Sequence, residues 1–131
     1  MIYIGVSESG AYAVIDGNQA EVRSSGKDMS SVLKTLNAKN TRCVIESSHP
    51  GYETTSLNKS PAEQMYLYCH LRNIPFMFVK PGSWMRDLSI DGNAVEVCKK
   101  LYPFTYIETR EDGSSPEADA LLLAVYAKKS L

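Results

Sequence analysis

A tight turn near the start of the chain most strongly limits what it can fold into. Asp16-Gly17-Asn18 lies between two short β-forming runs, Ala11–Ile15 and Gln19–Ser25. Gly, Asn and Asp tolerate the positive φ that a short hairpin loop demands, so this tripeptide between such runs favours a β-hairpin. The apolar run Ile2–Ser7 precedes the hairpin and is typical of a buried strand. The N-terminal segment therefore predicts three antiparallel strands.

The spacing of apolar residues changes after this hairpin. Behind Asp28, a residue suited to cap a helix, apolar side chains recur at helical spacing at Met29, Val32, Leu33 and Leu36. This spacing predicts a helix over residues 29–36. The following run, Thr41–Glu46, has the pattern of a short buried strand that ends on a carboxylate.

Helices and strands alternate along the rest of the chain. Ser60-Pro61-Ala62-Glu63 combines a capping box with proline at the first helical position, which predicts a helix from there to about Asn73. The further predicted elements are the strand Ile74–Val79, a short helix around Trp84, the helix Ala94–Leu101, and a helix that starts at Ser115-Pro116-Glu117 and runs through Tyr126. This order predicts an α/β fold with a mixed five-stranded sheet and helices on both faces, which is the RNase H-like arrangement.

Length and composition fit one such domain over residues 1–131, since 44% of the residues are hydrophobic and 22% are charged. The longest apolar run, Ala120–Ala127, is too short to cross a bilayer, and Met1 leads into a strand rather than a secretory leader. We therefore expect a cytoplasmic protein without a membrane partner. Cys43, Cys69 and Cys98 lack metal-ligand spacing and are expected to be reduced core residues.

Four acids occupy positions from which this fold would bring carboxylates together. They lie after the first strand, at the end of the fourth strand and in the last helix: Glu8, Glu46, Glu117 and Asp119. Hydrolysis of a phosphodiester by two metal ions needs several converging carboxylates, because Mg²⁺ prefers oxygen ligands. The competing interpretations are a carboxylate leaving the sheet edge for water at Glu46, and acids that interact with a helix dipole at Glu117 and Asp119.

Several short motifs together resemble the RuvC-like junction resolvases, especially those of bacteriophages. The motifs are Ile4-Gly5-Val6 with Gly10–Asp16, Val44-Ile45-Glu46 with His49-Pro50-Gly51, Pro81-Gly82-Ser83-Trp84, and Ala118–Ala124. They follow the family's order over nearly the whole chain. The resemblance implies a homodimeric Holliday junction endonuclease with two Mg²⁺ or Mn²⁺ ions per active site, located in the bacterial host cytoplasm if the chain is phage-encoded. Glu46 and Asp119 match two of the family's catalytic carboxylates.

Two departures from the family pattern concern the metal site. Ser7 stands where the family carries a catalytic Asp at the end of the first strand, and Pro116 stands where a further helix Asp is frequent. A serine hydroxyl brings no negative charge to a metal. Three interpretations stay open: Glu8 or Glu117 replaces the missing ligand, the chain is natively inactive, or Ser7 is a deliberate inactivating change.

Overall charge gives no support for nucleic-acid binding, because the net charge is −1 and the pI is about 6.1. Local candidates for phosphate contacts lie around Trp84, at Lys80, Arg86, Lys99 and Lys100, with Arg72 and Lys59 nearby. The competing interpretation of each is a solvated helix face.

Two residues in the loop after Glu46 are candidates for contacts with bases. His49 or Tyr52 would stack on an unpaired base at a junction centre. The competing interpretation of His49 is an ordinary loop histidine before a Pro-Gly turn. Trp84 is interpreted as a core anchor.

The leading hypothesis is therefore a structure-selective endonuclease for four-way or other branched DNA, weakened or inactive as written because of Ser7. The alternative is a protein of the same fold that binds branched DNA without cutting it. An actin-like ATPase domain also has an Ile-Gly-Val strand end, but 131 residues are too few for the two halves that close over a nucleotide.

Overall fold

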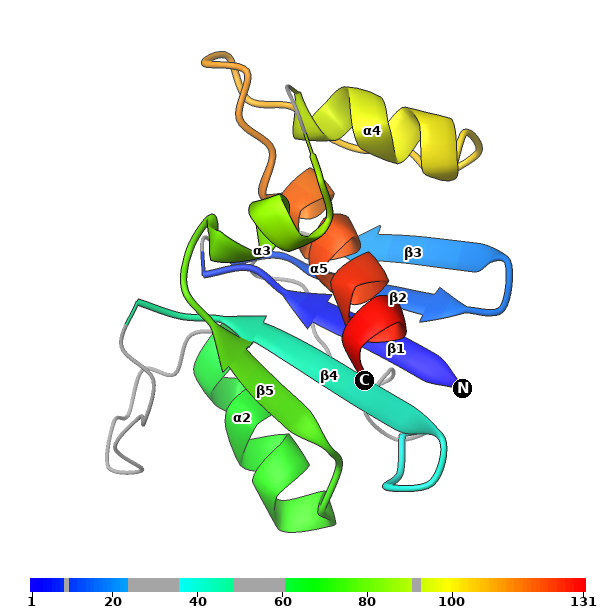
Figure 1. Ribbon diagram of the computed structural model, residues 1–131, viewed down its shortest axis with the longest axis vertical. Helices are drawn as coiled ribbons and strands as arrows, with labels where there is room; N and C mark the ends of the chain where they lie inside the picture. The colour runs from blue at the N-terminus through cyan, green and yellow to red at the C-terminus, as the bar shows by residue number, and fades with distance from the viewer. Residues whose placement is uncertain (9, 24–35, 49–60, 91–92) are drawn as a thin grey trace.

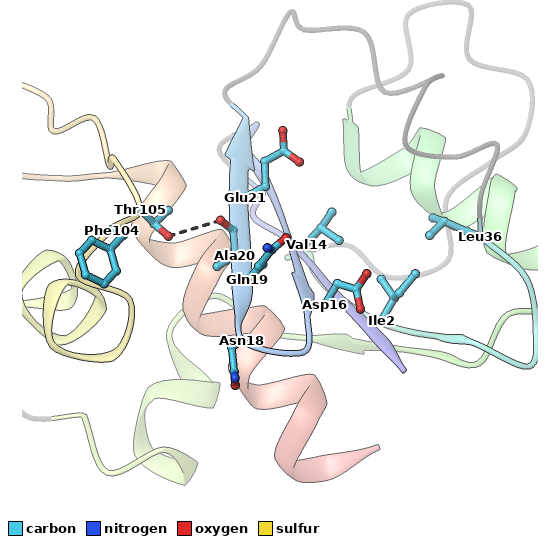
Figure 2. A pocket seen from close by; sticks show the side chains of 10 residues that line it. All are labelled: Ile2, Val14, Asp16, Asn18, Gln19, Ala20, Glu21, Leu36, Phe104 and Thr105. Carbon is cyan, nitrogen blue, oxygen red and sulfur yellow. Dashed lines mark hydrogen bonds between the residues drawn. The ribbon is translucent and has the colours of Figure 1, made fainter.

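Five strands form one mixed sheet in the order β3-β2-β1-β4-β5 (Figure 1). The strands are β1 (Ile2–Val6), β2 (Tyr12–Asp16), β3 (Gln19–Arg23), β4 (Thr41–Glu46) and β5 (Phe76–Val79). The pairs β1–β2 and β2–β3 are antiparallel, whereas β4 runs parallel to both β1 and β5. The structure, a computed structural model, describes residues 1–8, 10–23, 36–48, 61–90 and 93–131. The predicted mixed five-stranded α/β sheet is confirmed.

Helices cover both faces of this sheet, as predicted (Figure 1). The helices are α2 (Pro61–Arg72), α3 (Ser83–Asp87), α4 (Ala94–Leu101) and α5 (Pro116–Ser130). Because side chains alternate along a strand, the two faces build separate cores. One core joins α2 to Ile4 and Ile45, and the other joins α5, α4 and Trp84 to Ala13 and Val44.

The ends of some elements differ from the predicted ones for identifiable reasons. Asn73 adopts a left-handed φ of 55° just after the last residue of α2. The backbone N–H of Ile74 then donates a hydrogen bond to Cys69 O at 2.9 Å. Ile74 therefore closes the helix, and β5 begins at Phe76. The helix α5 continues past Tyr126 to Ser130. The helix predicted over residues 29–36 lies outside the described residues except for Leu36, which is buried.

The cysteine prediction is confirmed, because Cys43, Cys69 and Cys98 are all buried free thiols. Burial raises the pKa of Cys98 to about 12, which keeps this thiol protonated and unreactive at neutral pH. Within the described ranges, no helix is long and apolar enough to cross a membrane.

A very close approach between sheet and helix lies at Gly5 in β1. A Cβ atom built on Gly5 would lie 2.2 Å from Ala120 O and 2.4 Å from Ala124 N, both in the backbone of α5. These distances are far inside van der Waals contact, so no larger residue fits without moving the helix. The buried alanines on α5 complete the fit from the helix side. The strand β1 and the helix α5 are therefore held in one relative position.

This contact predicts a severe effect of Gly5→Ala. The added methyl group meets backbone rather than a mobile side chain. We therefore expect the free energy of unfolding, measured by urea denaturation, to fall by more than about 3 kcal/mol. Gly17→Ala is the matched control, because Gly17 has a φ of 61° but nothing within 4 Å of its added Cβ. Its cost should be only the backbone strain of roughly 1–2 kcal/mol. Equal losses in the two variants would contradict the tight contact at Gly5.

Candidate carboxylate site at the ends of β1 and β4

Glu46 ends β4 as a nearly buried carboxylate, with 6% of its surface exposed. Its Oε1 accepts a hydrogen bond from Glu8 N at 3.1 Å, and its Oε2 accepts one from Trp84 Nε1 at 2.8 Å. Strand alternation places it on the same face as Val44, which is the face that α5 covers. Both of these donors are neutral N–H groups, so the carboxylate of Glu46 is stabilised by N–H dipoles rather than by a positively charged side chain.

Asp119 lies in the first turn of α5, on the same side of the sheet. The turn is capped by Ser115, whose Oγ accepts from Ala118 N at 3.1 Å and whose carbonyl accepts from Asp119 N at 3.1 Å. Burial and, to a smaller extent, the negative charge of Glu46 together raise the pKa of Asp119 to about 6. The two predicted carboxylates are therefore close enough to repel each other, although they are 73 positions apart in sequence.

Ser7 follows β1 directly and lies beside Glu46, because the preceding residues Val6 and Ile45 are register partners. Its side chain is fully buried. The Ser7 Oγ accepts from Ala11 N at 3.1 Å and donates to Ala11 O at 3.3 Å, which closes the turn between β1 and β2. At the point where the family resemblance places a carboxylate, this chain thus has a hydroxyl that holds the hairpin together.

Glu8 and Glu117, the two predicted substitutes, have structural partners of their own. The exposed Glu8 accepts hydrogen bonds from the backbone N and, at 2.5 Å, the Oγ of Ser48. The buried Glu117 accepts from Glu108 N at 2.8 Å, which fixes the loop before α5. The use of either acid as a metal ligand stays a prediction.

The chemistry of Glu46 and Asp119 is compatible with one hard ion. The two side chains would supply carboxylate oxygens, and Mg²⁺ is commonly held by one or two carboxylates together with water and substrate phosphate. Among the described residues, however, no three His, Cys, Asp or Glu side chains are grouped so that they hold a metal ion. The third carboxylate that a two-ion site requires is absent from this group because the neighbouring position is Ser7.

The predicted DNA-contacting residues are only partly near this site. Lys80 follows β5 at the same sheet edge, since Val79 is the register partner of Glu46, and Arg86 lies on the adjacent α3. Lys80 and Arg86 are exposed, as are Lys99 and Lys100 on α4. His49, Tyr52 and Lys59 lie outside the described residues.

Arg72, in contrast, lies away from the site. It is the last residue of α2, and α2 lies on the face of the sheet opposite to α5 and Trp84 (Figure 1). The guanidinium carbon of Arg72 lies 5.0 Å from the centre of the Tyr68 ring. The sequence interpretation that placed Arg72 near the tryptophan segment is therefore wrong. The helix α2 runs back from the carboxylate edge over 12 residues, or about 18 Å.

Trp84 is fully buried, which confirms its predicted role as a core anchor. Sequence reasoning missed its second contact, the hydrogen bond from Nε1 to Glu46. A buried indole N–H normally finds an acceptor, and this rule signals that a partner exists. It does not identify a partner 38 positions away.

A solved structure shares this fold. The chain superimposes on the Thermus thermophilus RuvC structure with a TM-score of 0.54 and 12% sequence identity, over 96% of this chain and 92% of that chain. At this identity, the comparison establishes a RuvC-like, RNase H-like fold. No protein-family profile matches the chain, and no curated protein matches its sequence.

The raised pKa of Asp119 makes the stability of the fold depend on pH. Its pKa rises from an ordinary value of 3.8 to about 6 on folding, so the folded state binds this proton more tightly and stability falls as pH rises from about 4 to about 6. Because the carboxyl group is partly exposed, solvent screening limits the loss to roughly 1–2 kcal/mol. Asp119→Asn should remove this loss of stability. The free energy of unfolding measured in urea should therefore be higher for the variant than for the parent near pH 7 and equal for the two near pH 3.5.

Asp112→Asn is the control of opposite sign. Hydrogen bonds from Ser114 lower the pKa of Asp112, so its charge supports the fold at neutral pH. Removing that charge should weaken the fold near pH 7 rather than strengthen it. A stability difference between Asp119→Asn and the parent that does not change with pH would contradict the raised pKa of Asp119.

Proposed function

We propose that this protein is a structure-selective endonuclease for four-way or other branched DNA whose hydrolytic activity is weak with Ser7 in place. The observation that carries the proposal is the Glu46–Asp119 pair. The pKa of Asp119 is raised by burial and by the negative charge of Glu46, which supports an electrostatic interaction between two carboxylates from distant parts of the chain. Carboxylates are rarely brought together in a partly buried place without a chemical use.

In this proposal the two acids hold one Mg²⁺ or Mn²⁺ ion. Such an ion, when bound, lowers the pKa of a water ligand and stabilises charge on the scissile phosphate. Glu46 and Asp119 fix its place, while Lys80 and Arg86 contact DNA phosphates at the same edge. Lys99 and Lys100 extend this basic surface along α4. A two-fold homodimer would match the symmetry of a four-way junction with one site for each strand cut.

A second function is favoured by the contacts of Ser7. Its hydroxyl is bonded to both the N–H and the carbonyl of Ala11, which makes it part of the fold rather than a metal ligand. Without a third charge, the protein would bind branched DNA and leave it intact. A cleavage assay on a labelled four-way junction with Mg²⁺ or Mn²⁺ distinguishes the two functions.

Ser7→Asp should create or strengthen Mn²⁺-dependent cleavage of a four-way junction, because it adds a third carboxylate beside Glu46. In chelator the variant should melt below the parent through like-charge repulsion, and added Mn²⁺ should raise its Tm more than that of the parent. Ser7→Asn is the matched control, since it has nearly the shape of Asp without the charge. Cleavage by native gel and Tm by calorimetry are the measurements.

Two results would change this assignment. Efficient cutting by the parent chain would show that Glu8 or Glu117 serves as the third ligand. A Ser7→Asp variant that neither cuts nor responds to Mn²⁺ would leave branched-DNA binding as the function.

Lys80→Ala and Arg86→Ala should each weaken junction binding, and each should lower the slope of log affinity against log salt by about 1. Lys128→Ala and Lys129→Ala serve as controls, because they remove exposed charges from the far end of α5. Glu46→Gln should leave binding nearly intact. Mobility-shift titrations at several salt concentrations measure these effects. Equal losses in all four lysine and arginine variants would argue against a defined DNA-binding edge.

A further inference from the structure

The side chain of Trp84 both packs in the core and donates a hydrogen bond to Glu46. It is 0% exposed, and its Nε1 lies 2.8 Å from Glu46 Oε2, which is a short, charge-assisted hydrogen bond. A buried indole needs one acceptor, and a backbone carbonyl would satisfy that need equally well. Here the acceptor is instead the carboxylate that the proposed function assigns to the ion.

The two hydrogen bonds to Glu46 hold both of its oxygens. Trp84 Nε1 occupies one lone-pair direction on Oε2, and Glu8 N occupies one on Oε1. A carboxylate has about four such directions, so each oxygen keeps one for a further partner. With both oxygens tethered, the plane of the carboxylate is fixed while its remaining capacity is preserved.

The helix that carries Trp84 is itself anchored at both ends. Before α3, Gly82 takes a left-handed φ of 77° and Ser83 Oγ donates to Lys80 O at 2.8 Å. At its other end, Asp87 Oδ2 accepts from Tyr126 Oη of α5 at 3.1 Å. The indole is thus delivered from a short helix that is tied both to the end of β5 and to the helix that bears Asp119.

We propose that Trp84 is a positioning residue that orients Glu46 for ion binding. The inference rests on the proposed function and deepens it, since Trp84 acts through Glu46 and touches neither ion nor DNA. Residues that hydrogen-bond a metal ligand typically contribute 10–100-fold to metal affinity. A purely structural tryptophan would affect stability but would leave affinity for the ion unchanged in the folded protein.

The test measures Mn²⁺ affinity in the full chain with Ser7→Asp, by the electron paramagnetic resonance signal of free Mn²⁺. Adding Trp84→Phe removes the N–H donor and keeps an aromatic ring, and should weaken Mn²⁺ binding by about 10–100-fold. Ile15→Ala is the matched control. Ile15 is buried in the same core as Trp84, but it pairs with Tyr3, near the other end of β1. We expect it to lower the Tm with less than a ~3-fold effect on affinity.

A second readout needs neither metal nor the tryptophan variant. The chain contains one tryptophan, so the parent gives one indole N–H signal in NMR. Glu46→Gln replaces a charged acceptor by a neutral one, so this signal should shift and its hydrogen exchange should accelerate. The measurement tests the hydrogen bond that the inference requires, even if Trp84→Phe does not fold.

The outcomes separate this inference from the proposed function. A large affinity loss with Trp84→Phe and none with Ile15→Ala supports positioning, whereas equal effects would reduce Trp84 to a core anchor. If Ser7→Asp binds no Mn²⁺, the ion site of the proposed function fails and the positioning role fails with it, whereas Mn²⁺ binding that Trp84→Phe leaves unchanged overturns the positioning role alone. An indole signal that Glu46→Gln leaves unchanged would overturn the inference.

Discussion

The packing of β1 against α5 at Gly5 is the constraint on which the rest of the structure depends. Because this position carries no side chain, the helix backbone lies directly on the central strand. That contact decides where the first turn of α5 falls and brings Asp119 toward Glu46, although the two belong to different elements. Small residues in the middle of the fold therefore set the geometry of charged residues at its edge.

The carboxylate edge combines charges that repel with hydrogen bonds that hold them. Glu46 accepts hydrogen bonds from two N–H donors. The pKa of Asp119, in contrast, is raised by burial and by the negative charge of Glu46. Natural folds retain such local costs mainly where chemistry requires them. The other acids in this region differ, because Glu8 and Glu117 each accept hydrogen bonds from a loop.

Among the described residues, sequence reasoning recovered the elements and their order because their signals are local. The bounds of Ala94–Leu101 agree with the structure, since Asn93 caps the helix and its apolar residues recur regularly. The predicted convergence of Glu46 and Asp119 came from the predicted fold, which brings strand ends and the last helix together, and the family resemblance added only their catalytic roles. The contacts of Trp84 with Glu46 and of Glu117 with Glu108 were beyond reach, because they depend on how the chain returns to the sheet edge.

The serine-closed turn after β1 also affects the charge that the strand ends would present to the polyanionic partner of the proposed function. A cluster of three or four carboxylates without metal would repel an approaching phosphate backbone, and association would then wait for cations to bind first. With Ser7 bonded to Ala11, the strand ends carry one negative charge fewer than they would with Asp at this position. If the proposed function holds, this hydroxyl would therefore make the encounter with DNA depend less on divalent ions.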